Sequence, residues 1–481
     1  MEKCFDTKKY LKIQKKAIEE RLSKFSDRLY LEFGGKFIDD FHAVRTLPGY
    51  EANTKLKLLL SLKRDLGVIY CVSAKQLSEG KIRGDFGIGY DVATIKAVND
   101  LKNYGLKVEG VVINRFNGEK EALLLIRQLE EMGVKVITRG EIKNYPNDID
   151  LILSKNGFGK DNYLEVKNKL IVVWGAGPGS GKLSTCLGQI YHEIQRGENS
   201  GYAKFETFPV WNMEVEHPVN IAYEAATADL GDYNLIDPWH MKAYGIEAVN
   251  YNRDVESFPI IKKIFSQMLA KDNFSNCYQS PTDMGFNCLK SGIVDNEKIV
   301  EAAKKEINFY LFRYREEYKK GLVEKITLER MGDLMAEIGI NEEYLITVKK
   351  AREVNGAAIE LTDGRVITGK NSKFLTAFAA VLLNAVKTVS GIDDKYHLIS
   401  PSVIAQIIKL NRSLGKTKPA LNGAEIMLAW AISARDNPLA KKALSNIFKI
   451  KGCYLHAVDQ PVVADKELFR KLGVWLSSDG Q

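Results

Sequence analysis

Short apolar runs alternate with helix-length amphipathic segments through the first third of the chain. The runs are rich in branched residues and lie at 28–33, 67–73, 108–114, 134–139 and 150–154. Strands separated by helices of this length predict βαβ units and a Rossmann-like, mostly parallel sheet that is covered by helices on both faces. The run at 168–175 continues the series, so we expect it in the same sheet.

A glycine-rich loop follows the run at 168–175 and precedes a predicted helix. Its centre is Gly177-Pro178-Gly179-Ser180-Gly181-Lys182. Glycines allow consecutive backbone N–H groups to converge on an anion, and the positive end of the following helix adds to the attraction. We therefore expect Gly177, Gly179, Ser180, Gly181 and Lys182 to bind phosphate. A purely structural strand-to-helix turn is the alternative.

This loop departs from the triphosphate-binding loop at two positions. Ala176 occupies the place of the first glycine, and Leu183 occupies the place of the hydroxyl that holds magnesium. Successive helical residues are turned by about 100°, so Ser184 cannot replace residue 183. Phosphate capture is expected, magnesium-dependent hydrolysis is doubtful, and Leu183 is predicted to pack the helix against the sheet.

A second candidate site follows the first strand, where Gly34 and Gly35 precede several charged residues. Lys36, Asp39, Asp40 and His42 supply a cation, carboxylates and an imidazole at a strand end. Such a set could bind a phosphorylated or acidic ligand and transfer a proton. The alternative is a β-turn with solvated charges. Arg83 and Asp85, in the glycine-rich stretch 81–91, are weaker candidates.

The segment from about 200 to 290 is crowded with aromatic, amide and acidic residues. This composition suits recognition of a sugar or nucleotide, and the alternative is a loop-rich subdomain whose polar groups satisfy one another. Arg253 and Asp254 could form a charge pair beside the ligand. We expect some of the polar residues here to line one cleft with Lys182 or Lys36; they are Glu206, Asn212, Asp237, His240, Asn252 and Arg253.

Regular patterns return after about residue 325. An Asp-Gly turn within 359–369 predicts a β-hairpin, and helices are predicted nearby, one of them with a capping pair formed by Asn422 and Glu425. The predicted domains are an α/β domain at 1–160, the glycine loop with a polar subdomain at 161–325, and a mainly helical domain with a hairpin at 326–481.

Composition limits the class of protein. The net charge of +8 arises from 69 basic and 61 acidic residues, and no apolar run approaches the roughly 20 residues of a membrane span. Neither nucleic acid nor membrane is an expected partner.

The six cysteines are scattered and the start lacks a secretory signal, which predicts a cytoplasmic protein with reduced thiols. Cys186 is predicted to be a buried small hydrophobe. Arg196 stands where a zinc-protease helix needs its second histidine, so no metal site is predicted.

Five stretches carry a resemblance to a known family: LYLEFGGKFIDDFHAVRTLPG, GAGPGSGKLSTCLGQIYHE, GYAKFETFPVWN, HPVNIAYEAATADL and NYNRDVE. They resemble the bacterial family called domain of unknown function 1846, or uncharacterised protein family 0371, and the resemblance covers essentially the whole chain. It implies a cytoplasmic bacterial protein and assigns no reaction.

The residues themselves favour an enzyme that acts on a phosphorylated small molecule or a nucleotide. The ligand is expected on the loop from Gly175 to Lys182, and a homo-oligomer is compatible with the sequence. The alternative is a protein that senses a nucleotide or metabolite without chemistry. The candidate catalytic residues are Asp39, Asp40, His42 and Asp254, and the candidate binding residues are Gly177, Gly179, Ser180, Gly181, Lys182, Lys36 and Arg253.

Overall fold

The computed structural model describes residues 3–83 and 87–480, and these residues form two compact units. The sheet unit runs up to Glu224 and resumes over Asp232–Val300. The C-terminal unit comprises Ala225–Gly231 and the residues from Glu301 onward. Each unit has its own hydrophobic core. Within the described residues, no helix combines the length and apolar character that crossing a membrane would require.

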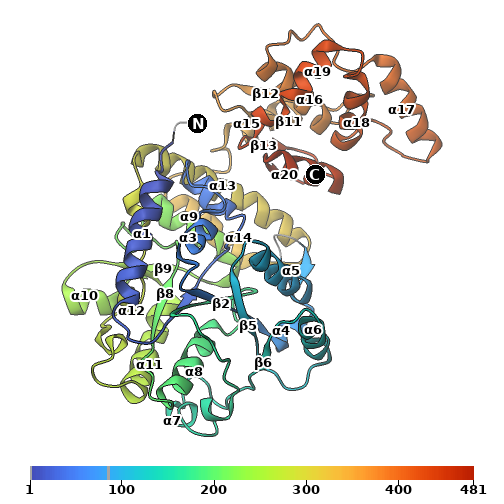
Figure 1. The fold of residues 1–481 in the computed structure, drawn as a ribbon. Coiled ribbons are helices and arrows are strands. Elements are labelled where there is room, and N and C mark those ends of the chain that lie inside the picture. Colours follow the sequence, from blue (N-terminus) through green and yellow to red (C-terminus); the bar gives the residue numbers. More distant parts are fainter. Residues whose placement is uncertain (1–2, 84–86, 481) are drawn as a thin grey trace. The chain divides into compact units, whose positions relative to one another are not determined.

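The sheet unit is built on one six-stranded parallel sheet (Figure 1). The strand order is β6-β5-β2-β7-β1-β8. Four of the five strands predicted in the first third, and the run at 168–175, lie in this sheet as predicted. The strands are β1 (Leu29–Phe33), β2 (Leu66–Ser73), β5 (Lys107–Asn114), β6 (Val136–Thr138), β7 (Leu170–Gly175) and β8 (Gly201–Phe205).

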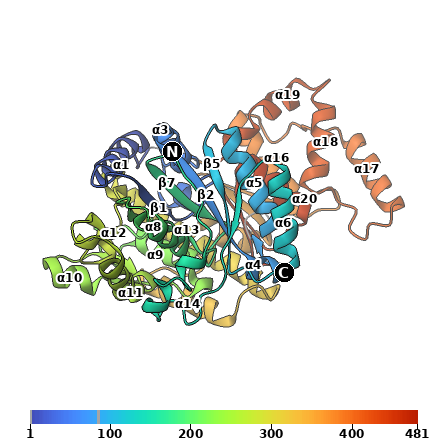
Figure 2. The same ribbon diagram turned by 60° about the horizontal axis from the view of Figure 1, so that its bottom comes forward.

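Helices cover both faces of this sheet, which explains why β2 is buried along its whole length. Leu29, Leu31 and Phe33 pack on one face, while Tyr30 packs on the other, as the alternation along a strand requires. Figures 1 and 2 show α5 and α6 on one side and α8 and α11 on the other. The first face carries α1 (Thr7–Leu22), α3 (Thr54–Leu62), α4 (Ala74–Ser78), α5 (Tyr90–Asn103) and α6 (Lys120–Glu131), and the second carries α7 (Ile149–Ile152), α8 (Lys182–Ile194) and α11 (Asn252–Met268).

One local prediction requires correction, and one strand of the sheet was not predicted. The run at 150–154 is not a strand, because Asp148 caps a short helix there and accepts a hydrogen bond from the Leu151 N–H at 3.0 Å. The edge strand β8 lies in the segment that was predicted to be polar and aromatic. Its apolar residues alternate with polar ones, since Ala203 and Phe205 face the first core while Lys204 faces the other side.

The rest of the sheet unit consists of short elements around the strand ends. The β3–β4 and β9–β10 pairs are antiparallel two-stranded ribbons. The other elements of the sheet unit are α2 (Phe41–Thr46), β3 (Ile82–Arg83), β4 (Ile88–Gly89), β9 (Asn234–Ile236), α10 (Pro238–Tyr244), β10 (Val249–Tyr251), α12 (Pro281–Met284), and the 3₁₀ helices Phe158–Lys160, Phe274–Cys277 and Leu289–Gly292. Two helices, α9 (Pro218–Ala226) and α13 (Asn296–Lys319), extend across the unit boundaries.

The C-terminal unit combines helices with a four-stranded sheet of order β12-β11-β13-β14. The predicted hairpin is present as the antiparallel pair β11–β12, and Asn422 and Glu425 form the predicted capping box. Strands β13 and β14 were not predicted. The elements are α14 (Lys325–Glu337), α15 (Ile346–Val354), β11 (Gly356–Glu360), β12 (Val366–Lys370), α16 (Ala377–Ser390), α17 (Pro401–Ser413), α18 (Gly423–Ser433), α19 (Pro438–Ser445), β13 (Tyr454–Ala457), α20 (Val463–Leu472), β14 (Trp475–Ser478), and the 3₁₀ helices Ala228–Leu230 and Ile447–Ile450.

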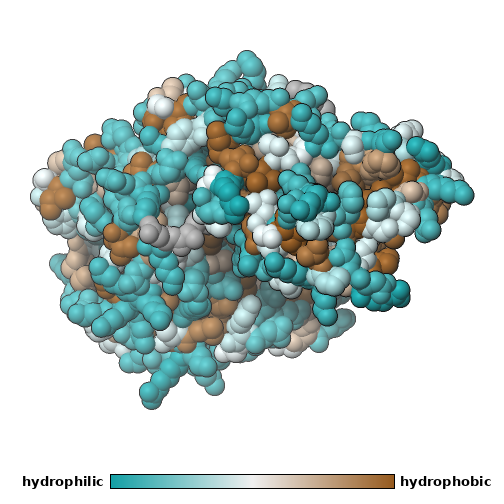
Figure 3. Space-filling model, turned by 90° about the horizontal axis from the view of Figure 1, so that it is seen from above, coloured by the Kyte–Doolittle hydropathy of each residue, from teal (hydrophilic) through white to brown (hydrophobic). Residues whose placement is uncertain are grey.

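On the face shown in Figure 3, hydrophilic side chains predominate and apolar ones form scattered patches. Exposed apolar side chains of the C-terminal unit include Leu414, Leu428 and Ile432. Single exposed apolar residues are common on folded proteins and define no site by themselves.

Candidate functional site

The glycine loop, residues 175–182, joins the carboxyl end of β7 to the first residue of α8. Gly179 and Gly181 have φ angles of 74° and 86°, a region that side chains disfavour. A Cβ on Gly177 would lie 2.5 Å from the Tyr90 hydroxyl oxygen, and one on Gly181 would lie 2.6 Å from Asn114. Both left-handed backbone geometry and close packing therefore require glycines in this loop.

The loop presents backbone donors at the start of α8. The Thr185 N–H donates to the Gly181 carbonyl at 2.9 Å, and this is the first hydrogen bond of the α8 helix. The N–H groups of residues 181–184 have no acceptor within the described chain, as expected for the first turn of a helix. Lys182 adds a side-chain cation to this turn. Free N–H groups, the helix dipole and the ammonium together can hold an anion.

Ser180 lies at the base of the glycine loop. Its side chain is fully buried and its hydroxyl has no hydrogen-bond partner within the described chain. The Asn114 side-chain amide fixes the loop by donating a hydrogen bond to the Ser180 carbonyl at 2.9 Å. A buried hydroxyl without a partner is unusual in folded proteins, and a water or ligand atom in the loop would satisfy it.

Leu183 stands where a triphosphate-binding loop has its magnesium-binding hydroxyl. The side chain packs against the apolar cluster that contains Ile171, Val173 and Leu187. The prediction that Leu183 anchors α8 to the sheet is therefore confirmed. Among the described residues, no His, Cys, Asp and Glu side chains form a group of three or more that could hold a metal ion.

A charged cluster lies at the carboxyl ends of β1 and β8. We call Glu32, Lys204, Glu206, Tyr251 and Asp254 the lysine–carboxylate cluster. Glu32 and Lys204 are register partners on the adjacent parallel strands. The Lys204 ammonium donates to Asp254 at 2.5 Å, contacts the Tyr251 hydroxyl, and lies 3.2 Å from Glu206. Tyr251 donates in turn to Glu206 at 2.6 Å. Lys204, Glu206, Tyr251 and Asp254 thus form a continuous network, while Glu32 accepts a hydrogen bond from the Tyr202 hydroxyl at 2.8 Å.

The network sets the protonation of its members. Burial disfavours the charged form of Lys204, but the surrounding carboxylates, Asp254 first, outweigh burial and raise its pKa. Lys204 therefore stays an ammonium and cannot serve as an amine nucleophile. Burial raises the pKa of Asp254 to about 6, Lys204 opposes this rise, and Glu206 adds to it. Asp254 can consequently exchange a proton near neutral pH, which suits a general acid or base.

A small pocket of about 50 Å³ opens beside this cluster. Lys204, Glu206 and Asp254 form its charged side. The remaining lining is aromatic, amide and hydroxyl in character and includes Phe208, Trp211, Asn250, Tyr251, Thr282, Phe286 and Asn287. Of the six residues predicted to line one cleft with Lys182 or Lys36, Glu206 alone lines this pocket, and its lysine is Lys204. The predicted cleft is therefore not found among the described residues.

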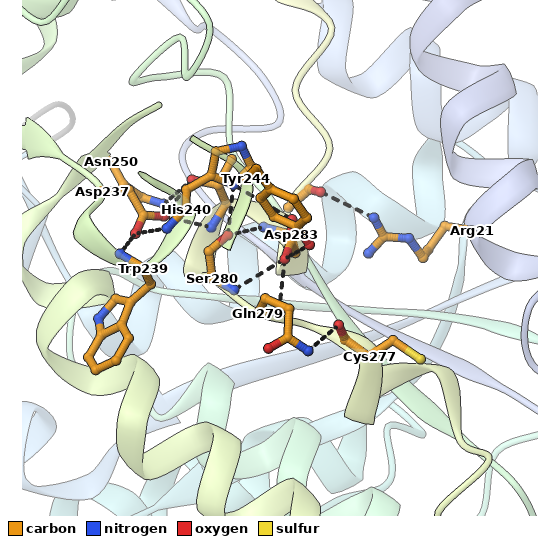
Figure 4. Close-up of polar contacts among 12 residues, drawn as sticks. Arg21, Asp237, Trp239, His240, Tyr244, Asn250, Cys277, Gln279, Ser280 and Asp283 are labelled. Carbon is orange, nitrogen blue, oxygen red and sulfur yellow. Dashed lines mark hydrogen bonds and ion pairs between the residues drawn. The ribbon is translucent and has the colours of Figure 1, made fainter. Parts of the chain in front are cut away.

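A buried polar network supports the pocket from α10 and α12 (Figure 4). Asp237 caps α10 and accepts a hydrogen bond from the Thr282 hydroxyl at 2.7 Å. His240 Nδ1 lies 3.0 Å from the Ser280 hydroxyl, and Asp283 completes a capping box with Ser280. Ser280 is fully buried and its hydroxyl accepts the Asp283 N–H, so this Ser–His–Asp set fixes the pocket wall and exposes no nucleophile.

The predicted residues of the second candidate site form a capped turn. Asp40 caps α2 and pairs with buried Lys55 at 2.9 Å. Burial raises its pKa, but the Lys55 ammonium dominates, and His42 and Lys36 add to it, so the net pKa is lowered. Asp39 has a φ of 57°, and its N–H donates to an amide oxygen at 3.4 Å. The ion pair with Lys55 gives Asp40 a structural role. A catalytic role for Asp40 or Asp39 stays a prediction.

His42 is the residue of the second candidate site that contacts the lining of the pocket. Its ring centre is 5.1 Å from that of Phe208, which lines the pocket, and 6.4 Å from that of Tyr223. Of the two weaker candidates in the stretch 81–91, Arg83 lies on β3, and Asp85 lies outside the described residues. His42 thus has an aromatic contact with the pocket lining.

The predicted Arg253–Asp254 pair does not form. Arg253 pairs with Asp232 at 2.5 Å, while Asp254 pairs with Lys204 at the same distance. The two are consecutive residues at the start of α11, and consecutive helical side chains point about 100° apart. Arg253 therefore pairs outside the lysine–carboxylate cluster, although its guanidinium lies 5.8 Å from the ring centre of Tyr251.

Cys186 on α8 interacts electrostatically with a residue of the glycine loop and with a residue of the lysine–carboxylate cluster. Burial raises the pKa of the Cys186 thiol, Glu32 raises it further, and Lys182 acts in the opposite direction. The thiol is thus within electrostatic reach of both residues. Cys186 is fully buried and its thiol stays protonated, in agreement with the prediction that it is a small hydrophobe.

Sequence reasoning missed Glu32 and did not recognise the role of Lys204. The available signal was the period-two series Tyr202, Lys204, Glu206, which places three polar groups on one face of a strand. It was hidden because β8 is short and follows no long apolar run.

Fold and site together define an α/β protein with a parallel six-stranded sheet, a glycine loop at its carboxyl edge and a C-terminal unit with its own sheet. The family models for the domain of unknown function DUF1846 match its N-terminal part at residues 3–339 and its C-terminal part at 342–481. The chain belongs to this family, which confirms the resemblance.

Curated relatives are similar along their whole length. A UPF0371 protein of Clostridium botulinum (strain Langeland / NCTC 10281 / Type F) is 45% identical over 490 residues, which cover 99% of this chain and 97% of the relative. A UPF0371 protein of Clostridium tetani (strain Massachusetts / E88) is 44% identical with the same coverage.

Proposed function

We propose that this protein is an enzyme that binds the phosphate group of a phosphorylated small molecule or nucleotide at the glycine loop. The observation that carries the proposal is the set of unpaired N–H groups at residues 181–184, next to two left-handed glycines and Lys182. The buried Ser180 hydroxyl without a partner supports it, since a bound group or its water would complete that site.

The chemistry is proposed for the lysine–carboxylate cluster on the same edge of the sheet. Asp254 has a pKa of about 6, raised by burial, and can therefore transfer a proton near neutral pH. Lys204 holds the Asp254 carboxylate in place through a 2.5 Å contact. The reaction is proposed for the cytoplasm, where the six free cysteines would remain reduced.

A metabolite sensor is the second candidate function. The observation that favours it is the mutual pairing within the cluster, because a network whose members satisfy one another can be purely structural. The two functions differ in one respect that can be measured: an enzyme converts its ligand, whereas a sensor releases it unchanged.

The first experiment identifies the ligand. A thermal-shift screen with nucleotides, sugar phosphates and inorganic phosphate should reveal compounds that stabilise the protein, because a ligand specific for the folded state raises apparent stability. Calorimetry then compares Lys182→Ala with Lys169→Ala. Lys169 is an exposed lysine just before β7, at the opposite edge of the sheet, and is a matched control for loss of one positive charge.

We expect Lys182→Ala alone to weaken binding, and equal affinity in both variants would contradict the proposal. Turnover of the best ligand is then followed by phosphorus NMR. Conversion that is lost in Asp254→Asn, with binding retained, supports the enzyme. Binding without any conversion supports the sensor.

A further inference from the structure

We propose that the pocket beside the lysine–carboxylate cluster binds a neutral, hydroxyl-bearing ring, namely a sugar or cyclitol. This inference rests on the proposed function in one respect, since the ring would be part of a ligand whose phosphate occupies the glycine loop. It adds the chemical class of that ligand and the residues that would select it.

The pocket offers hydrogen-bond acceptors and no available cation. An ammonium has three N–H donors, and those of Lys204 are directed at Asp254, Glu206 and the Tyr251 hydroxyl. Each carboxylate can accept about four hydrogen bonds, and the bonds from Lys204 and Tyr251 use only some of them. The remaining lone pairs of Asp254 and Glu206 border the pocket. Hydroxyl groups are donors that such a wall can bind.

The charge of the cluster determines which part of a ligand can enter. Glu32, Glu206 and Asp254 supply three carboxylates against the single ammonium of Lys204. An anion would be repelled by this excess, so a phosphate group belongs at the glycine loop and a neutral group belongs in the pocket.

Part of the pocket lining is aromatic. Phe208, Trp211 and Phe286 line the pocket, and the Trp211 indole N–H donates to the Asn287 carbonyl at 3.0 Å. That bond satisfies the polar edge of Trp211, which leaves its ring as an apolar surface. A pocket that combines apolar ring surface with hydrogen-bond acceptors matches a ring that carries C–H groups on its faces and hydroxyls on its rim.

The volume of the pocket also limits its occupant. At about 50 Å³ it has room for a few groups the size of water, each of which needs roughly 10–15 Å³. One edge of a hydroxylated ring fits this space, and the rest of the ring would lie outside it.

The test compares phosphorylated probes by calorimetry. The ring probes are ribose 5-phosphate, glucose 6-phosphate and inositol 1-phosphate, and the controls are glycerol 3-phosphate, ethanolamine phosphate and inorganic phosphate. We expect at least one ring probe to bind ten or more times as tightly as every control. Trp211→Leu and Glu206→Gln should abolish this preference and leave the affinity for inorganic phosphate unchanged.

Trp239→Leu is the matched control variant. The Trp239 indole also donates to a backbone carbonyl, that of Val255 at 3.3 Å, but the residue does not line the pocket. It should therefore retain the preference for the ring probe. Ring probes that bind no better than glycerol 3-phosphate would overturn the inference while leaving phosphate binding intact, and a preference for ethanolamine phosphate would show an amine pocket instead.

A second measurement holds even if no phosphate compound binds, which would refute the proposed function. Ribose, glucose and inositol at millimolar concentration are titrated while tryptophan fluorescence is followed in the wild type and in Trp211→Leu. A saturable change that is present in the wild type and absent in the variant supports the sugar pocket. No such change for any of the three overturns it.

Discussion

Glu32 on β1 and Lys204 on β8 are register partners at the carboxyl edge of the parallel sheet. Their strands are adjacent, so both side chains point to the sheet face that is covered by α8 and α11. This pairing places an acidic group between the glycine loop and the pocket, within electrostatic reach of Cys186 and Lys204.

Removing the charge of Lys182 should weaken phosphate binding. We expect Lys182→Ala to lose about 1.5–3 kcal/mol of binding free energy, the range for a hydrogen bond to a charged group. Lys169→Ala should change it by much less, because that exposed lysine precedes β7. Calorimetry with the best ligand measures both. An unchanged affinity in Lys182→Ala would leave the loop as a turn without a ligand.

Adding a methyl group at Gly181 should disturb the loop. Gly181 has a φ of 86°, and a Cβ there would lie 2.6 Å from Asn114. Gly245 is the matched control, because its φ is 68° and a Cβ at that position would have no neighbour within 4 Å. Backbone strain alone costs about 1–2 kcal/mol, which is the expected loss in Gly245→Ala. Gly181→Ala should lose more in urea unfolding, and equal losses would contradict the packing argument.

Shortening Leu183 should affect stability. Leu183 is partly buried against the core beneath α8, so Leu183→Ala should lower the free energy of unfolding by about 1–3 kcal/mol, less than for a fully buried leucine. Phosphate affinity should change little, since the backbone N–H of residue 183 remains. A large loss of affinity with unchanged stability would show that Leu183 contacts the ligand.

Replacing Lys204 should leave buried carboxylates without their cation. We expect Lys204→Met to lower the free energy of unfolding by about 3–5 kcal/mol at pH 7, the cost of breaking a buried ion pair. The loss should be smaller at pH 5, where Asp254 is more protonated. Lys262→Met, on the exposed side of α11, should cost well under 1 kcal/mol. A loss that does not depend on pH would contradict the electrostatic explanation.

Asp254 should make stability fall as the pH rises. Burial raises its pKa from 3.8 to about 6, so between these values the folded state binds more protons than the unfolded state. Its contribution is therefore fully present below about pH 4 and is lost as the pH rises through 6. Each pH unit is worth at most about 1.4 kcal/mol.

The measurement is urea unfolding of wild type and Asp254→Asn across this range. The free energy of the wild type should fall relative to that of the variant as the pH rises. A constant difference between the two proteins would refute the raised pKa.

The parallel sheet could be predicted from local sequence patterns. Residues of β2 and β7 are buried on both faces, and such strands need continuous apolar runs that can be recognised without knowledge of their partners. The strand-to-helix glycine loop was predictable for the same reason, because φ > 0 at Gly179 and Gly181 is a local demand of the backbone. The short helix at 149–152 was missed, since one capping bond from Asp148 outweighs a weak strand preference.

The lysine–carboxylate cluster and the pocket depend on how distant parts of the chain pack together. Tyr202 and Glu32 are 170 residues apart, and they meet because β8 pairs with β1 rather than with β7. Likewise, Asp254 contacts Lys204, and Arg253 contacts Asp232, because the orientation of α11 assigns each side chain its direction. Local sequence fixes which backbone conformations are favourable, but the partner of a polar side chain depends on strand order and helix orientation, which packing of the whole unit sets.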